Sequence, residues 1–279
     1  MNLDRRKFIK LSAASVATVG LGGLGFSFAR RYNVEVSRLE VKLARLPAEF
    51  NGLTIAQMSD IHHGPFTGLD YISHCVGIVN DLKTDVIALT GDFIFGGERY
   101  IEPCAEALSP LRARAGVYAV LGNHDYYHSA GRVARALRRA GFTVLVDGQE
   151  RFERGGAQLW LLGLDDLYYG QWDLNRVMRR LPEGEAKVVL AHNPDFIEKF
   201  AEQEKRVDFI LSGHTHGGQV RIPVIGAPHV PSEYGQQYAI GLNHKGPMQV
   251  YTTRGIGTVG PPVRFDCPPE IVLHTLRRA

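Results

Sequence analysis

Two histidines two residues apart, His214 and His216, stand in a glycine-rich turn of the 279-residue chain. They follow the apolar run 207–211, which predicts a buried strand. Side chains at positions i and i+2 of an extended segment point the same way, so both imidazoles can reach one small volume. Neutral imidazole is the commonest metal ligand among side chains. The spacing therefore suggests a metal site, although ordinary loop histidines would produce the same pattern.

Four other segments share this form, an apolar β-branched run that ends in residues suited to a metal or a phosphate. The runs and the residues that follow them are 53–59 with Asp60 and His62, 86–90 with Asp92, 117–121 with Asn123 and His124, and 188–191 with His192. In α/β sheets, ligands bind beyond the carboxyl ends of the strands. We therefore expect these strand ends to converge on one site.

The order and content of these segments resemble the calcineurin-like metallophosphoesterase superfamily, from about Leu53 to the C-terminus. The blocks of that family are Asp-x-His, Gly-Asp, Gly-Asn-His-Asp/Glu, His and Gly-His-x-His. They stand here as Asp60/His62, Gly91/Asp92, residues 122–125, His192 and residues 213–216. The resemblance implies an α/β fold, a four-layer α/β/β/α sandwich of two mixed β-sheets flanked by helices.

The resemblance also implies roles for the site residues. Asp92 would bridge two divalent metal ions. Its partners in one metal site would be Asp60, His62 and His216, and in the other Asn123, His192 and His214. Oxygen and nitrogen ligands without a thiolate favour Mn, Fe or Zn. His124 is the family's non-ligand histidine, placed to protonate the leaving group.

One departure from the family concerns the residues after Asp92. The protein-phosphatase branch has Gly-Asp-x-x-Asp-Arg-Gly, whereas Phe95 and Gly96 stand here in place of Asp-Arg. His124 therefore lacks that branch's orienting carboxylate, and a phosphoserine or phosphothreonine phosphatase is disfavoured. Arg254 and Arg264 are candidates to bind substrate phosphate, and ion pairs within their loop are the alternative.

Residues 217–219, 254–258 and 262–265 resemble bacterial exported or membrane-associated phosphoesterases. Some relatives there cleave the pyrophosphate of UDP-2,3-diacylglucosamine, so we expect a phosphodiesterase or pyrophosphatase acting on a membrane or envelope substrate, such as this type of lipid A precursor. A phosphomonoesterase of broad specificity and a non-catalytic metal-binding scaffold are the alternatives. The Pro-, Gly- and aromatic-rich segment 222–238 predicts either an apolar wall beside the site or a loop packed on the core.

The first thirty residues read as a targeting segment. Arg5, Arg6 and Phe8 precede the apolar stretch 11–29 and resemble a twin-arginine export signal. An uncleaved membrane anchor is the alternative, because the stretch is long enough to span a bilayer. We therefore expect residues 1–30 to be signal or anchor and residues 31–279 to be the catalytic domain. The expected location is the periplasm or cell envelope after contact with the twin-arginine machinery, or the inner-membrane surface.

Composition adds limits on partners and on the remaining elements. A formal net charge of +3 predicts no nucleic-acid partner. Three scattered cysteines give no disulfide framework.

Beyond the strands already named, we expect a hairpin of strands 143–146 and 159–164 turning at 153–156, and later strands at 219–224, 248–253 and 271–276.

Overall fold

The computed structural model describes residues 31–279, which form two six-stranded sheets. The first sheet has the order β1 (Glu35–Leu43), β12 (Glu270–Arg278), β2 (Thr54–Met58), β3 (Val86–Thr90), β4 (Val117–Val120) and β5 (Thr143–Val144). The second has the order β10 (Gly241–Lys245), β11 (Met248–Thr252), β9 (Phe209–Ser212), β8 (Ala186–Leu190), β7 (Ala157–Gly163) and β6 (Gly148–Arg154). Both sheets are mixed, since parallel central strands meet antiparallel ones at β12, β6 and β10.

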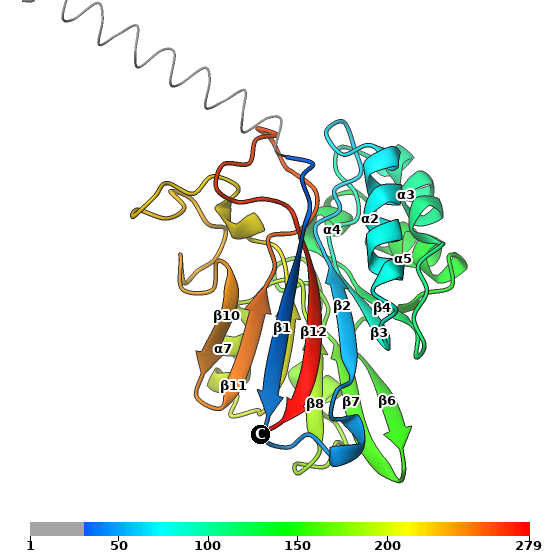
Figure 1. The fold of residues 1–279 in the computed structure, drawn as a ribbon, viewed down its shortest axis with the longest axis vertical. Coiled ribbons are helices and arrows are strands. Elements are labelled where there is room, and N and C mark those ends of the chain that lie inside the picture. Colours follow the sequence, from blue (N-terminus) through cyan, green and yellow to red (C-terminus); the bar gives the residue numbers. More distant parts are fainter. Residues whose placement is uncertain (1–30) are drawn as a thin grey trace, which may run out of the picture.

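Helices cover the outer faces of both sheets (Figure 1). The helices α2 (Leu69–Asp81), α3 (Ile101–Leu108) and α5 (Ala130–Arg139) pack on the first sheet, and α6 (Leu174–Val177) and α7 (Phe196–Glu202) pack on the second. A third apolar cluster lies between the two sheets. The fold is therefore the α/β/β/α sandwich that the sequence predicted.

Alternation along the central strands explains why this chain builds three apolar layers. In β3, Ile87 and Leu89 pack beneath the helices, while Val86 and Ala88 pack between the sheets. In β8, Val188 and Leu190 face the inter-sheet core, and Val189 faces the outer one. Successive side chains of a strand point to opposite faces, so a strand buried on both sides reads as a continuous apolar run.

Two predicted elements were wrong. The hairpin turns after Arg154 as expected, but its first arm is β6, and Thr143–Val144 instead pairs with β4 in the other sheet. The arm β6 is an edge strand with no buried residue, so it shows no apolar run. No strand forms at 219–224, where Gln219 and Val224 have positive φ and a tight turn joins Ile222 to Gly226.

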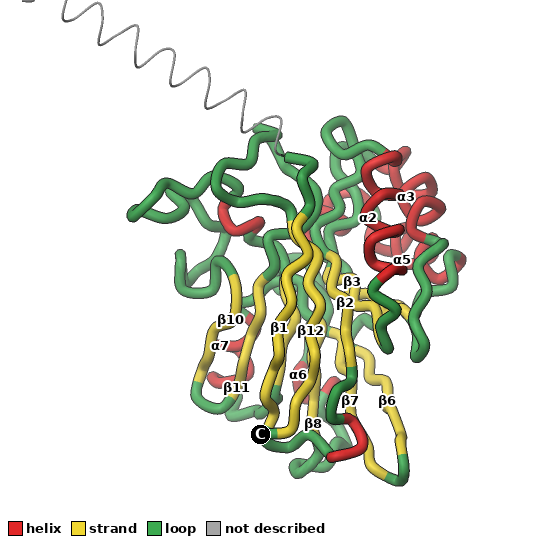
Figure 2. The backbone as a smooth tube through the Cα atoms, viewed as in Figure 1, coloured by secondary structure: helices red, strands yellow, loops and turns green. Residues whose placement is uncertain are grey.

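The central parallel strands of both sheets end at the same edge of the sandwich. Figure 2 shows their ends leading into the loops at the upper end of the molecule. The predicted site residues follow these strand ends. Within residues 31–279, no helix combines the length and the apolar character needed to cross a bilayer. Residues 1–30, on which the signal and anchor predictions fall, lie outside the described part of the chain.

Candidate metal centre

The strand ends bring seven predicted ligands together by sharp left-handed turns. Five of them have positive φ: Asp60 (51°), His62 (47°), Asp92 (57°), His214 (70°) and His216 (51°). Non-glycine residues adopt this backbone region rarely, and such strain clusters at functional sites. Each turn aims a polar side chain back across the strand ends instead of letting it continue along the strand.

Glycines between these residues make room for the side chains. A Cβ at Gly213 would lie 2.2 Å from Asp60 Oδ2, and one at Gly122 would lie 2.3 Å from Asp92 Oδ1. A Cβ at Gly91 would lie 2.7 Å from His192 Nδ1. The glycines of the Gly-Asp, Gly-Asn-His and Gly-His motifs therefore allow the backbone to approach the predicted ligands closely.

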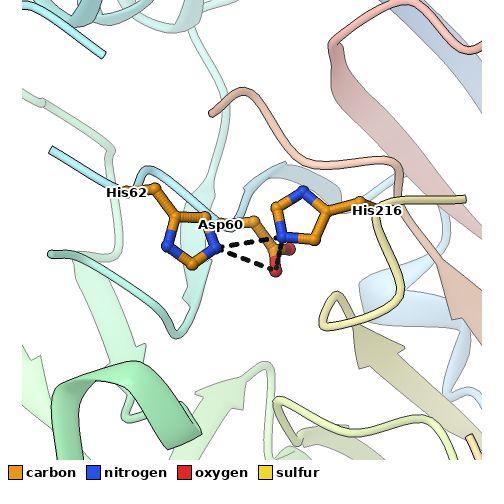
Figure 3. A group of neighbouring side chains, drawn as sticks. All are labelled: Asp60, His62 and His216. Atoms are coloured by element: carbon orange, nitrogen blue, oxygen red, sulfur yellow. Dashed lines mark hydrogen bonds and ion pairs between the residues drawn. The ribbon is translucent and has the colours of Figure 1, made fainter. Parts of the chain in front are cut away.

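The first ligand cluster consists of Asp60, His62 and His216 (Figure 3). The Nε2 atoms of the two imidazoles lie 3.0 Å apart, and His216 Nε2 lies 3.4 Å from Asp60 Oδ1. Only one proton can lie between two facing imidazole nitrogens, so at least one lone pair points into the gap. This set of donors fits a divalent cation bound by nitrogen and oxygen.

The second cluster surrounds His192. Its Nε2 lies 3.1 Å from Asn123 Oδ1, 3.2 Å from His214 Nδ1 and 3.2 Å from Asp92 Oδ2. Its Nδ1 lies 2.8 Å from the carbonyl oxygen of Thr90, which accepts a hydrogen bond and directs Nε2 toward the other three groups. This arrangement is typical of a metal-binding histidine held by a backbone carbonyl.

Asp92 joins the two clusters. Its Oδ2 lies 3.4 Å from His62 Nε2 in the first cluster and 3.2 Å from His192 Nε2 in the second. Its Oδ1 accepts a hydrogen bond from the backbone N–H of His124 at 2.8 Å. One carboxylate oxygen thus faces both clusters, as a bridging ligand must.

Burial sets the protonation of these groups. It lowers the pKa of His62 to about 3, and it lowers the pKa of His214 to about 3 with help from the charge of His192. Burial also lowers the pKa of His216 well below its usual value. Burial disfavours the charge on His192 as well, but the nearby Asp92 carboxylate outweighs it and raises that pKa. Three imidazoles are therefore neutral near pH 7, the form that binds metals.

A cleft of about 900 Å³ opens onto the clusters. Its floor includes Asp92, Asn123, His214 and His216. Much of its lining is apolar or aromatic, namely Tyr127, Tyr168, Tyr169, Val220, Pro228, Val230, Pro231, Val259, Pro261 and Val263, and the polar side chains of Gln219, His229, Ser232 and Glu233 line it as well. The part of segment 222–238 around Pro228–Pro231 thus forms a wall beside the site.

Comparison with known proteins agrees with this geometry. The family model for calcineurin-like phosphoesterases matches residues 53–218, which span all five motifs. This chain belongs to that family.

Two relatives match this chain over nearly their whole length. This chain is 32% identical over 284 residues to the uncharacterized metallophosphoesterase YkuE of Bacillus subtilis, and the match covers 99% of this chain and 98% of the relative. It is also 32% identical over 282 residues to the phosphodiesterase YaeI of Escherichia coli, covering 98% and 99%. The protein is therefore a metal-dependent phosphoric ester hydrolase of a family that uses divalent metals.

His124 lies beside the candidate metal ligands and lines the cleft. Its ring packs edge-on against His62 at 4.8 Å and Tyr127 at 5.1 Å, and against Phe95 at 5.5 Å between centroids. No hydrogen bond to its imidazole occurs within residues 31–279. Aromatic packing therefore orients this ring where the protein-phosphatase branch has a carboxylate. Burial lowers the pKa of His124, and the Asp92 carboxylate opposes the shift.

Asp125 is a positioning residue that sequence reasoning missed. Its fully buried carboxylate accepts hydrogen bonds from the backbone N–H groups of Asp92, Phe93 and Gly122, at 2.9 to 3.0 Å. Burial and the Asp92 charge raise its pKa to about 7. It ties the turn after β3 to the turn after β4. The fourth position of the Gly-Asn-His-Asp block was the available signal, because a carboxylate in the first turn of a helix, here α4 (Asn123–His128), commonly accepts backbone hydrogen bonds.

The two candidate substrate arginines do not line the cleft. Arg254 forms ion pairs with Glu270 at 3.1 Å and Glu35 at 3.3 Å. Arg264 is 2% exposed and donates to the carbonyl oxygens of Arg254, Gly255, Gly257 and Cys267. Both guanidinium groups serve internal partners, which favours the structural alternative for them.

Proposed function

We propose that this protein hydrolyses a phosphodiester or pyrophosphate bond with two divalent cations held by the clusters that Asp92 joins. The observation that carries the proposal is the position of Asp92 Oδ2, within 3.4 Å of His62 and 3.2 Å of His192. Asp60, His62 and His216 would hold one cation, and Asn123, His192 and His214 the other. A pair of divalent cations supplies an activated water and neutralises the phosphoryl oxygens during in-line displacement.

His124 would donate a proton to the leaving oxygen. Its ring lines the cleft next to the ligands and is free of hydrogen-bonded partners in the described chain. Packing against Tyr127 and Phe95 limits its rotation. A positioned general acid of this kind contributes roughly 10²–10⁴-fold to the rate.

The lining of the cleft supports a diester over a monoester. No lysine or arginine is among the residues that line it. A monoester dianion would need more positive charge around the phosphoryl group than a diester monoanion. The apolar and aromatic walls suit a bulky second ester group, and one relative is named a phosphodiesterase.

The proposed substrate belongs to the membrane or cell envelope. Residues 1–30 support this placement through their paired arginines and the uncharged stretch 11–29. They would act as an export signal or anchor for the catalytic domain 31–279. A UDP-diacylglucosamine-type lipid is one candidate, because the apolar wall could take up an acyl chain.

The test begins with metal content and hydrolysis by the purified full-length protein. We expect about two equivalents of Mn, Fe or Zn, faster hydrolysis of bis-p-nitrophenyl phosphate than of p-nitrophenyl phosphate, and loss of turnover after chelation. Asp92→Asn should remove both metals and activity, whereas Asp81→Asn, an exposed control at the end of α2, should keep both. A tenfold or greater preference for the monoester, about 1.4 kcal/mol, would contradict the diester assignment. A metal-free inactive protein would support a scaffold instead.

Substrate chemistry and location have separate tests. Comparing acylated and deacylated UDP-sugar substrates addresses the lipid, and equal kcat/KM values for both would remove it. Replacing Arg5 and Arg6 together with lysine should leave the protein in the cytoplasm if the twin-arginine signal operates. Unchanged export would refute that signal without affecting the assignment of hydrolysis.

A further inference from the structure

An apolar turn projects from the protein beside the cleft. Its tip consists of Ile222, Pro223, Val224 and Ile225, and the exposed fractions of its branched aliphatic residues are 39% for Ile222, 107% for Val224 and 64% for Ile225. Residues 222–232 contain no Asp, Glu, Lys or Arg. Single exposed apolar residues are normal in soluble proteins, but contiguous ones mark interaction sites.

The turn is held in shape by its own backbone. The N–H groups of Ile225 and Gly226 donate to the carbonyl oxygen of Ile222, at 3.1 and 2.8 Å. Val224 is forced to φ 71°, a region that a β-branched residue occupies only under constraint. This strained turn keeps the Val224 side chain fully outside the protein, and strain of this kind is typical of functional sites.

The tip is continuous with the rim of the cleft. Residues 219–221, which lead into the turn, pair with the segment before Cys267. Arg221 N–H donates to Phe265 O and Phe265 N–H donates to Gln219 O, both at 2.9 Å. That segment contributes Pro261 and Val263 to the cleft wall. In Figure 1 the turn is the gold loop that projects at the upper left, at the same end as the orange loop of residues 259–265.

The described chain begins at this same rim. Arg31 Nη1 lies 3.5 Å from the carbonyl oxygen of Pro262, and Tyr32 donates to the carbonyl oxygen of Phe66. Residues 11–29, which precede this point, contain no Asp, Glu, Lys or Arg. Arg31 thus lies at the rim that carries the apolar tip, and the stretch 11–29 before it is uncharged; both features point to a lipid surface as the partner of this edge.

We propose that the tip at 222–225 inserts into the interfacial region of a lipid bilayer and turns the mouth of the cleft toward the membrane. An element without charged groups can enter this region because it leaves no ionised side chain to desolvate. Insertion would remove Ile222, Val224 and Ile225 from water. The inference goes beyond the proposed hydrolysis and does not depend on which bond is cleaved.

Fluorescence quenching tests the insertion directly. The full-length Val224→Trp protein would be reconstituted with vesicles of phosphatidylethanolamine and phosphatidylglycerol, with and without brominated acyl chains. Interfacial insertion to a depth of about 5–10 Å should quench the added indole by roughly half or more. Glu153→Trp is the matched control, because Glu153 is exposed on β6 at the opposite end of the molecule and should remain unquenched (Figure 1). Emission of the native Trp160 and Trp172 is subtracted using the unsubstituted protein.

Two further measurements keep the result decisive. Ile225→Trp repeats the experiment one residue along, in case the strained position 224 rejects an indole. An emission shift that depends on protein concentration without vesicles would show that a second copy covers the tip, and would overturn the proposal. Absence of quenching at both positions in vesicle-bound protein would also overturn it, and would leave a protein partner as the occupant. Hydrolysis is not measured in either arm, so failure here leaves the proposed function standing.

Discussion

Replacing Gly122 with alanine tests how closely the Asp92 carboxylate, which joins the two clusters, is held. Gly122 has φ −114°, which alanine adopts without strain, so the change adds one methyl group and little else. That Cβ would lie 2.3 Å from Asp92 Oδ1, 2.7 Å from Asp92 N and 2.8 Å from His192 Cε1. All three distances are shorter than any ordinary contact, so Asp92 or the turn that carries Gly122 must move.

The neighbours have little freedom to move. Asp92 Oδ1 accepts the N–H of His124 at 2.8 Å, and Gly122 N donates to Asp125 at 2.9 Å. Overpacking of a well-packed site costs about 1–3 kcal/mol. A displacement of about 1 Å near a reacting centre can cost about 10²-fold in rate. We therefore expect the Gly122→Ala protein to lose metal, to lose about 1–3 kcal/mol of unfolding free energy and to fall about a hundredfold in kcat/KM.

The assay combines metal analysis, urea unfolding and diester hydrolysis. Gly77→Ala is the matched control, because Gly77 lies exposed in α2 and an added Cβ would meet nothing within 4 Å. Alanine in a helix interior should raise its unfolding free energy by about 0.5–1 kcal/mol and leave metal content unchanged. If the Gly122→Ala protein keeps its full metal content and its kcat/KM, the close approach at Asp92 does not matter and the reasoning fails.

Three other perturbations address the support of the site. In Asp125→Asn, an amide NH₂ group replaces one of the two oxygens that accept the N–H groups of Asp92, Phe93 and Gly122, so a donor faces a donor. We expect the unfolding free energy to fall by about 1–3 kcal/mol and the protein to retain metal less well. An unchanged unfolding free energy in urea would refute this role of Asp125. Arg264→Met leaves buried carbonyl oxygens without their donor and should cost at least about 3 kcal/mol; a change below about 0.5 kcal/mol, typical of a surface position, would show that the guanidinium is dispensable. His274, whose Nε2 lies 2.9 Å from Gln57 Oε1, has its pKa lowered from 6.5 to about 3 by burial. As the pH falls, His274 is protonated in the unfolded chain before it is protonated in the folded protein. The unfolding free energy should therefore fall by up to about 1.4 kcal/mol per pH unit from pH 6.5 toward about pH 3. His274→Gln should reduce this slope by the contribution of one proton, and an unchanged dependence of stability on pH would contradict the prediction.

The strand ends were predictable because their signals are local. An apolar run, a glycine and a ligand-type residue stand next to one another at Gly91 and Asp92, and again at Gly213 and His214. Parallel strands of an α/β sheet end at one edge, so their convergence follows from the order of the runs. The layered architecture follows for the same reason, since strands buried on both faces need apolar cover on each side.

The wrong elements lacked such a local signal. The arm β6 has no buried residue and so no apolar alternation, and its pairing with β7 depends on the turn at Gly155 and Gly156. The segment 219–224 contains strand-forming residues, but hydrogen bonds to Phe265 and Gly226 make it a turn. In this segment, hydrogen bonds to other parts of the chain overrode the strand propensity, and such contacts cannot be predicted from neighbouring residues alone.

The sequence by itself determined which residue types reach the strand ends, and hence the family and its hydrolytic chemistry. The tertiary structure decided how each long side chain is used. An arginine guanidinium can donate either to a phosphate or to backbone carbonyls, and the burial of Arg264 among the carbonyls of residues 254–257 settles where its hydrogen bonds go. His124 is oriented by Phe95 and Tyr127 rather than by a carboxylate. Such roles depend on distances between residues far apart in the chain, and these distances exist only once the two sheets have packed together.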